Sequence, residues 1–284
     1  MVFLRSYLFV PGNNLSVVKK AVSSAADCII LDLEDAVAHS EKEKARETVE
    51  EALLKFGKEK TMFVRINDIG TSYWKKDVSC AVENGAKGII VPKAESEYGI
   101  KMACNEVKSC IGNAKNEFCI VPLIETAKGV QFAYEISSAD KMIQRLAFGS
   151  IDFSLDIDCE LTPSGLELLF ARSQIVIASK AAKIAPPIDA VFPNIKDEQG
   201  LEREARFARQ VGFKSKLAIH PKQLATIHAV FSPNEKEIAE AKEIVEAFEA
   251  AEKEGVASIT VNNTLVDYPV YKKAVSLLFQ IDNS

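Results

Sequence analysis

The feature that most constrains the fold of this chain is an eightfold alternation of short apolar runs with amphipathic helical stretches between residues 7 and 231. The runs are apolar at successive positions, which is typical of parallel strands that are covered on both faces. Eight strand–helix pairs are the number that closes such a sheet, so the sequence predicts a (β/α)8 TIM barrel. The alternative is an open doubly wound sheet. That fold normally has fewer strands and a glycine-rich first turn, and Pro11-Gly12-Asn13-Asn14 does not match the G-x-G-x-x-G motif.

The hydrophobic period also gives approximate bounds for each element. Ser72 is the expected cap of the third helix, and Gly85 lies just past the end of that helix. Strands are predicted at residues 7–10, 28–33, 62–66, 88–91, 118–124, 145–148, 188–192 and 216–219. Helices are predicted at residues 15–26, 41–56, 72–84, 97–111, 129–137, 167–183, 199–211 and 221–231.

Residues 232–284 do not belong to the repeat, so we expect a barrel at 1–231 followed by a C-terminal helical extension. Ser232-Pro233-Asn234-Glu235 is the expected start of a long helix that reaches about residue 254. Residues 259–266 have hairpin character with Asn262-Asn263 at the turn, and a last helix is predicted at 270–279. A lid or an oligomer contact is the role expected of this extension.

Charge and composition exclude several classes of protein. The 35 basic and 40 acidic residues give a net charge of −5, and such a surface repels nucleic acid and anionic lipid. No apolar run is long enough to cross a bilayer, and Val10-Pro11-Gly12 ends the first apolar stretch too early for a cleavable signal. We therefore expect a soluble cytoplasmic protein with no nucleic-acid or membrane partner. Six cysteines without Cys-x-x-Cys spacing indicate reduced thiols, and three histidines make a structural zinc site improbable.

Ionisable side chains gather where the predicted strands end. Asp32, Glu34 and Asp35 follow the second strand, and Arg65 lies near the end of the third. Lys93, Glu125 and Asp152 follow the fourth, fifth and sixth strands. Because the carboxyl ends of the strands of a parallel barrel meet at one face, we expect these side chains to converge there.

The residue types suggest a chemistry for this face. Glu125 and Asp152 suit Mg²⁺, which keeps several waters and accepts one or two carboxylates, although they could instead be solvated or salt-bridged. Arg65 can clamp a carboxylate in bidentate fashion, or it can pair with the acidic cluster at residues 32–35, and both can hold together. The cluster has two interpretations. It can be a solvent-exposed start of the next helix, or it can orient Arg65 or a metal-bound water. Lys93 is expected to pair with a carboxylate or the substrate rather than form a Schiff base, because nothing visible lowers its pKa. The pattern favours a metal-assisted aldol or Claisen centre.

At these same residues the chain resembles the HpcH/HpaI aldolase/citrate lyase family, and in particular the citrate lyase β subunit and the citramalyl- and malyl-CoA lyases. The resemblance runs in order through nearly the whole chain. The matching segments are Arg5–Asn13, Leu31–Val37, Val64–Asn67, Val91–Lys93, Leu123–Thr126, Ala147–Asp152, Glu167–Arg172, Ile188–Asp189 and Gly212–Pro221.

The resemblance implies a Mg²⁺-dependent carbon–carbon lyase that cleaves a 3-hydroxyacyl thioester into an acyl thioester and a 2-keto acid. It implies that Glu125 and Asp152 hold Mg²⁺ and that Arg65 holds the carboxylate of the keto acid. Glu34 and Asp35 are candidate catalytic residues beside Arg65, and Glu125 and Lys93 are candidate substrate-binding residues. Val266-Asp267-Tyr268-Pro269 is similar to the family's C-terminal segment, which in some members closes over the site of a neighbouring subunit. The resemblance implies that Asp267 acts as acid/base, and a helix cap is the other interpretation of Asp267.

The resemblance leaves the substrate and the partners open. Citryl, citramalyl and malyl thioesters on CoA or on an acyl carrier all remain candidates, and the chain is expected to form a homotrimer or hexamer. Residues 162–165 and 261–269 resemble subunits of the citrate lyase complex, which has α and γ partners, whereas Ile219-His220-Pro221 resembles the free-standing CoA lyases. The alternatives are a malate synthase-like condensing thioesterase and a carrier-dependent component of the citrate lyase complex.

Overall fold

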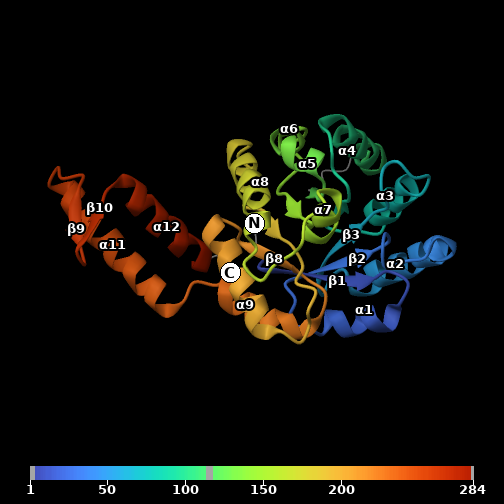
Figure 1. Ribbon diagram of the computed structural model, residues 1–284, viewed down its shortest axis with the longest axis horizontal. Helices are drawn as coiled ribbons and strands as arrows, with labels where there is room; N and C mark the ends of the chain where they lie inside the picture. Colours follow the sequence, from blue (N-terminus) through green and yellow to red (C-terminus); the bar gives the residue numbers. More distant parts are fainter. Residues whose placement is uncertain (1–3, 113–117, 283–284) are drawn as a thin grey trace. The chain divides into compact units, whose positions relative to one another are not determined.

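Eight parallel strands close into a barrel in the computed structural model, which describes residues 4–112 and 118–282 (Figure 1). The strands pair in chain order, and the last pairs with the first through Ser6 opposite Lys216 and Leu8 opposite Ala218. The TIM barrel is therefore confirmed, and the open sheet is excluded. The strands are β1 (Ser6–Pro11), β2 (Cys28–Asp32), β3 (Thr61–Arg65), β4 (Gly88–Val91), β5 (Cys119–Ile124), β6 (Ala147–Phe148), β7 (Ile188–Asp189) and β8 (Ser215–Ala218).

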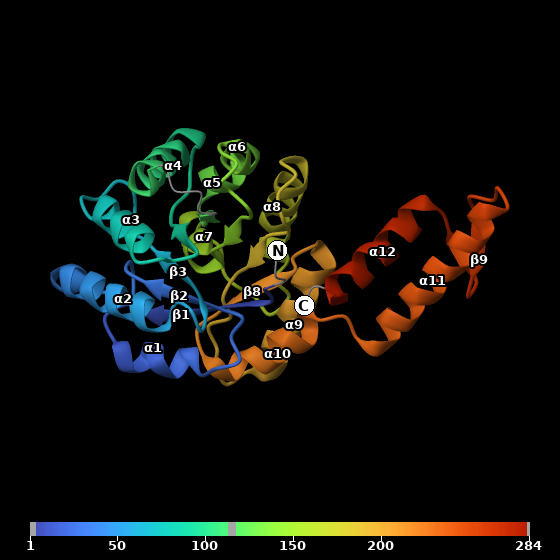
Figure 2. The ribbon, with the colours of Figure 1, turned by 180° about the vertical axis from the view of Figure 1, so that it is seen from behind.

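Helices follow the strands along the chain and surround them, as the opposite views of Figures 1 and 2 show. They are α1 (Leu15–Val22), α2 (Lys42–Phe56), α3 (Trp74–Glu83), α4 (Glu97–Ile111), α5 (Ala127–Gln131), α6 (Ala133–Ser138), α7 (Ser150–Asp156), α8 (Leu169–Ala181), α9 (Glu198–Val211) and α10 (Leu224–Phe231). Short 3₁₀ turns at His39–Glu41, Leu166–Leu168 and Pro221–Gln223 lead into α2, α8 and α10.

Burial explains why the apolar runs became strands. Ile29, Ile30 and Leu31 of β2 are consecutive, and all three are 0% exposed. Successive strand residues point to opposite faces, so these side chains fill both the barrel interior and the layer beneath the helices. Each such aliphatic side chain contributes about 1.5–3 kcal/mol by leaving water.

Several predicted elements were wrong in detail. The predicted helix at 129–137 is two short helices, because Thr126 caps a first one that begins at Ala127 and Phe132 then leaves the helical conformation. Ser72 is not the cap of α3, which begins after Tyr73 without a side-chain cap. The strands β6 and β7 are only two residues long, and α7 was not predicted at all.

A buried ion-pair network joins α8, β7, β8 and α9. The Asp189 carboxylate accepts hydrogen bonds from Nε of Arg172 at 2.8 Å and from Nζ of Lys216 at 2.5 Å. Lys216 also donates to Glu204 at 2.7 Å. Arg172, Asp189 and Lys216 are 0% exposed. Each charge of the network compensates another, so the loss of one partner would leave an uncompensated buried charge.

The described chain divides into two compact units, Arg5–His228 and a second formed mainly by the residues from Ala229 onward. The second unit contains α11 (Glu235–Lys253), β9 (Ile259–Val261), β10 (Thr264–Val266) and α12 (Tyr268–Asp282). Phe248 of α11 is fully buried, and its ring packs against those of Tyr268 and Tyr271 at centroid distances of 5.1 and 4.8 Å. These aromatic contacts hold α11 and α12 together.

The turns of the second unit follow the sequence closely. The long helix begins at Glu235, within the segment expected to start it. Asn234 caps it, and the side chains of Asn234 and Glu237 form a reciprocal capping box. Asn262 and Asn263 both have positive φ, of 47° and 59°, and they connect two antiparallel strands. Positive φ at both central residues is the geometry of a type I′ hairpin turn, so the predicted hairpin is confirmed.

All six cysteines are free thiols, as expected, and Cys28, Cys104 and Cys119 are buried. Within the described part of the chain, no helix combines the length and the apolar composition that a membrane span needs.

Candidate active site

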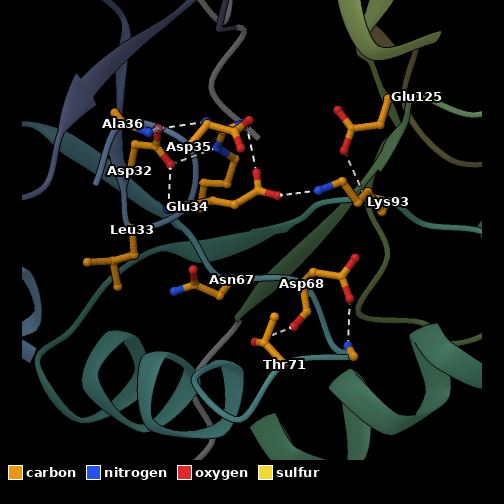
Figure 3. Close-up of polar contacts among 12 residues, drawn as sticks. Asp32, Leu33, Glu34, Asp35, Ala36, Asn67, Asp68, Thr71, Lys93 and Glu125 are labelled. Atoms are coloured by element: carbon orange, nitrogen blue, oxygen red, sulfur yellow. Dashed lines mark hydrogen bonds and ion pairs between the residues drawn. The ribbon is translucent and has the colours of Figure 1, made fainter. Parts of the chain in front are cut away.

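Charged side chains from four neighbouring strands meet at the carboxyl-terminal face of the barrel (Figure 3). Asp32 ends β2, Arg65 ends β3, Lys93 lies two residues beyond β4, and Glu125 directly follows β5. Asp32 and Arg65 are paired in the register of β2 and β3, so the parallel sheet itself sets them side by side.

Arg65 is held on two sides. Its Nε and Nη2 atoms donate to the two oxygens of Asp32 at 2.7 and 2.6 Å, and its guanidinium carbon lies 4.8 Å from the ring centroid of Phe9. Nη1 faces Glu34 and Asp35 at 3.1 and 3.4 Å. Burial disfavours the charge of Arg65, but hydrogen bonds and attraction from Asp32 outweigh it and raise its pKa. The guanidinium is therefore a fixed, permanent positive charge.

Asp32 also shapes the turn that follows its strand. Its two oxygens accept the backbone N–H groups of Glu34 at 2.9 Å and of Ala36 at 3.2 Å. A single buried carboxylate thus orients both Arg65 and the turn that carries Glu34 and Asp35. The ion pair weighed for the acidic cluster is present in the structure.

Glu34 is the buried member of that turn, with a side chain only 7% exposed. Its Oε1 accepts a hydrogen bond from Nζ of Lys93 at 3.1 Å, whereas Oε2 has no hydrogen-bond partner among the described residues. Burial raises the pKa of Glu34 against the lowering effect of the Arg65 charge. For Lys93, burial lowers the pKa, but attraction from Glu34 outweighs this and leaves it above its ordinary value. Lys93 is therefore a charged, carboxylate-pairing lysine, as expected.

The backbone at Lys93 is unusual, with a φ of 48°. This left-handed conformation costs a non-glycine residue about 1–2 kcal/mol. It directs the N–H of Lys93 to Oε1 of Glu125, which it meets at 2.7 Å. Strained backbone of this kind clusters at functional sites, where the surrounding structure enforces it.

Glu125 is almost completely buried, at 2% exposure. Burial, reinforced by repulsion from Glu34 and Asp152, raises its pKa to about 8 despite the hydrogen bond from Lys93. Its Oε2 lies against Gly149, where an added Cβ would sit only 2.6 Å from that oxygen. Glycine is therefore required beside this carboxylate. Gly149 and Phe9 were not among the residues predicted for the site. The only signal for them in the sequence is that each lies in a segment resembling the family, Phe9 in Arg5–Asn13 and Gly149 in Ala147–Asp152.

Asp152 lies in the first turn of α7, three residues after Gly149, and it is half-buried. Its charge acts on the pKa of Glu125, so the two carboxylates are electrostatic neighbours. No group of three or more His, Cys, Asp or Glu side chains suited to a metal occurs in residues 4–112 and 118–282. Two carboxylates are a donor set that fits Mg²⁺, which completes its octahedron with water and substrate oxygens.

Asp267 belongs to the second unit, not to the barrel. Its Oδ1 accepts the N–H of Val270 at 3.2 Å, so it caps α12. The helix-cap interpretation thus describes its role within its own unit. Five of the residues expected at the site lie together on the barrel: Glu34, Asp35, Arg65, Lys93 and Glu125. The charge of Asp152 acts on Glu125, and Asp267 belongs to the second unit.

Known proteins share both the sequence and the architecture. The family model described as HpcH/HpaI aldolase/citrate lyase matches residues 5–221, and one described as a C–C bond lyase of the TIM-barrel fold matches residues 170–274. The citrate lyase subunit beta of Leuconostoc mesenteroides subsp. cremoris is 38% identical over 279 residues, covering 95% of this chain and 90% of that protein.

Two further relatives point the same way. The L-malyl-CoA/beta-methylmalyl-CoA lyase of Cereibacter sphaeroides is 32% identical over 303 residues, covering 98% of this chain and 94% of that protein. The crystal structure of CitE from Mycobacterium tuberculosis in complex with magnesium, acetoacetate and coenzyme A has a TM-score of 0.80 and 28% identity, and the match covers 98% of each chain. The chain therefore belongs to the HpcH/HpaI aldolase/citrate lyase family of TIM-barrel carbon–carbon lyases, as its resemblance implied.

Proposed function

We propose that this chain cleaves a 3-hydroxyacyl thioester into an acyl thioester and a 2-keto acid with the help of Mg²⁺. The observation that carries the proposal is a buried Arg65 that Asp32 orients and that faces Glu34 at 3.1 Å, with the buried carboxylate of Glu125 joined to the same cluster through Lys93. A fixed cation beside carboxylates suits a substrate that carries both a carboxylate and a hydroxyl group.

Glu125 and Asp152 would hold the Mg²⁺. The fit rests on their chemistry: both are hard oxygen donors, and Oε2 of the buried Glu125 lies against Gly149, where a Cβ would crowd it. When bound, the ion would polarise the hydroxyl and carboxylate oxygens of the substrate.

The chain's own residues would divide the remaining work. Arg65 binds and orients the carboxylate that leaves with the keto acid through its Nη1 edge, which faces Glu34 and Asp35 in this structure. Glu34, whose pKa burial raises above its ordinary value, takes the hydroxyl proton, with Asp35 beside it. The electron pair of the broken carbon–carbon bond remains on the α-carbon of the thioester, and Asp267 delivers a proton to that carbon.

We propose further that residues 232–284 bring Asp267 to a barrel site as part of a homotrimer or hexamer in the cytoplasm. A second candidate is the β subunit of a citrate lyase complex, with α and γ partners and a carrier-bound citryl thioester. The 38% identity to the Leuconostoc subunit supports this candidate, since the malyl-CoA lyase relative is 32% identical.

The test is to incubate the protein and Mg²⁺ with each of three thioesters: citryl-CoA, citramalyl-CoA and malyl-CoA. The keto acid released, oxaloacetate, pyruvate or glyoxylate, is then measured. Cleavage of one of them, lost with EDTA and in Glu125→Gln, is the expected result. If the protein cleaves none of the three CoA esters but cleaves the citryl thioester of an acyl carrier, the result favours the β subunit of a citrate lyase complex. CoA release from acetyl-CoA and glyoxylate without any cleavage selects the condensing thioesterase, and full activity of Glu125→Gln removes the metal role of that residue.

A further inference from the structure

Lys42 is a buried lysine that none of the proposed chemistry uses. It occupies the first position of α2 and is only 3% exposed. A cation in the first turn of a helix opposes the helix dipole, and burial of an ammonium group is costly. Burial accordingly lowers the pKa of Lys42, although attraction from Asp32 and Asp77 opposes the shift. Because both the helix dipole and burial disfavour a charged lysine at this position, other contacts must stabilise the Lys42 ammonium.

The contacts of its ammonium group suggest that role. Nζ donates to the backbone carbonyl of Leu33 at 2.7 Å and to that of Glu34 at 2.6 Å. These two carbonyls belong to the turn between β2 and α2, the turn whose N–H groups are held by Asp32 (Figure 3). Two side chains therefore hold the backbone of this turn: the Asp32 carboxylate binds its N–H groups, and the Lys42 ammonium binds its carbonyls.

We propose that Lys42 is a positioning residue that fixes the backbone of Leu33 and Glu34 and thereby aims the Glu34 carboxylate at Arg65 and Lys93. An apolar side chain of the same length would fill the space but leave two carbonyls without this donor. The Glu34 side chain itself is held by Lys93, which is 43% exposed, and by Nη1 of Arg65 at 3.1 Å, and both contacts require the backbone of Glu34 to present its carboxylate at the right place. The inference rests on the proposed function for its catalytic consequence, but not for its structural one.

The structural consequence is tested first, without any substrate. Lys42→Met keeps the apolar shape and removes the donors, and Lys44→Met on the same helix is the matched control, because the Lys44 side chain is 73% exposed. Hydrogen exchange of the Glu34 and Ala36 amides should become at least about tenfold faster in Lys42→Met and stay unchanged in the control. Unchanged exchange in Lys42→Met overturns the proposal, whether or not the protein is a lyase.

The catalytic consequence is tested with a thioester that the wild-type protein cleaves, below the melting temperature of every variant. Misplacement of a reacting group by about 1 Å costs on the order of 100-fold in rate, so kcat should fall about 10- to 100-fold in Lys42→Met with Mg²⁺ affinity unchanged.

A double variant separates positioning from general destabilisation. If Lys42 acts through Glu34, then Lys42→Met combined with Glu34→Gln should be no slower than Glu34→Gln alone, within about threefold. If the double variant instead loses kcat by the product of the two single-variant factors, Lys42 does not act through Glu34 and the positioning role is overturned. A wild-type protein that cleaves no thioester refutes the proposed function instead, and the exchange measurement still decides the role of Lys42.

Discussion

Gly149→Ala is the substitution with the sharpest expected effect on the barrel site. Gly149 joins β6 to α7 with φ −109° and ψ 89°, a negative φ, so alanine meets no left-handed strain there. The added Cβ would instead lie 2.6 Å from Oε2 and 2.7 Å from Cβ of Glu125. Any effect of this substitution is therefore steric and is directed at one carboxylate.

The size of the effect follows from these distances. Carbon atoms in favourable contact lie about 3.5–4.0 Å apart, so Glu125 or the β6–α7 junction must retreat by about 1 Å. Overpacking of this kind costs about 1–3 kcal/mol of stability. A 1 Å displacement of a metal-binding or substrate-binding carboxylate costs about 100-fold in rate. We expect Gly149→Ala to lose about 100-fold in kcat and to bind Mg²⁺ more weakly.

The assay is turnover as a function of Mg²⁺ concentration, together with calorimetric Mg²⁺ titration and urea unfolding. Gly70→Ala is the control, since Gly70 is exposed and its added Cβ would meet only Oδ1 of Asp68, at 3.0 Å. If Gly149→Ala folds and keeps wild-type turnover and Mg²⁺ affinity, the placement of Glu125 against Gly149 has no functional importance and the reasoning fails.

Three further outcomes are expected. Asp189→Asn should lower the free energy of unfolding in urea by about 3–5 kcal/mol, because Arg172 and Lys216 keep their buried charges and lose their shared carboxylate; a loss below 1 kcal/mol would contradict this. Burial lowers the pKa of His228 in the folded protein below its unfolded value of about 6.5. The neutral imidazole therefore contributes stability above about pH 6.5, and this contribution is lost as the pH falls through the lower folded pKa. His228→Gln should therefore flatten the fall in stability between about pH 7 and 5, and an unchanged slope would exclude this source. Arg65→Lys should lower kcat/KM by about 100-fold or more, since a lysine cannot keep both hydrogen bonds to its carboxylate partner; near-normal kcat/KM would show that charge alone suffices.

The barrel could be predicted from the sequence because its strands are apolar on both faces and its long helices are amphipathic. Residues 97–111 and 88–91 were predicted at their observed bounds for this reason. The weak points were short elements. Residues 150–156 form about two turns of helix, too short to show a clear period. The strand β7 ends after Asp189, where the apolar run continues as loop.

The candidate site was predictable as far as strand order dictates it. Arg65 and Asp32 are register partners, so an ion pair between them follows once β2 and β3 are neighbours. The burial of Lys42 and the left-handed backbone of Lys93 were not predictable, since both depend on how one segment packs against another. A lysine is normally exposed and normally has a negative φ, so the residue type at positions 42 and 93 gives no sign of either feature.

The way Arg65 is anchored has a thermodynamic consequence for ligand recognition. A free arginine side chain has about 2 kcal/mol of rotamer entropy to lose when it is immobilised. Here Asp32 and the Phe9 ring have already removed that freedom when the chain folds. An arriving anion therefore meets a preorganised receptor and retains more of its interaction energy as net affinity.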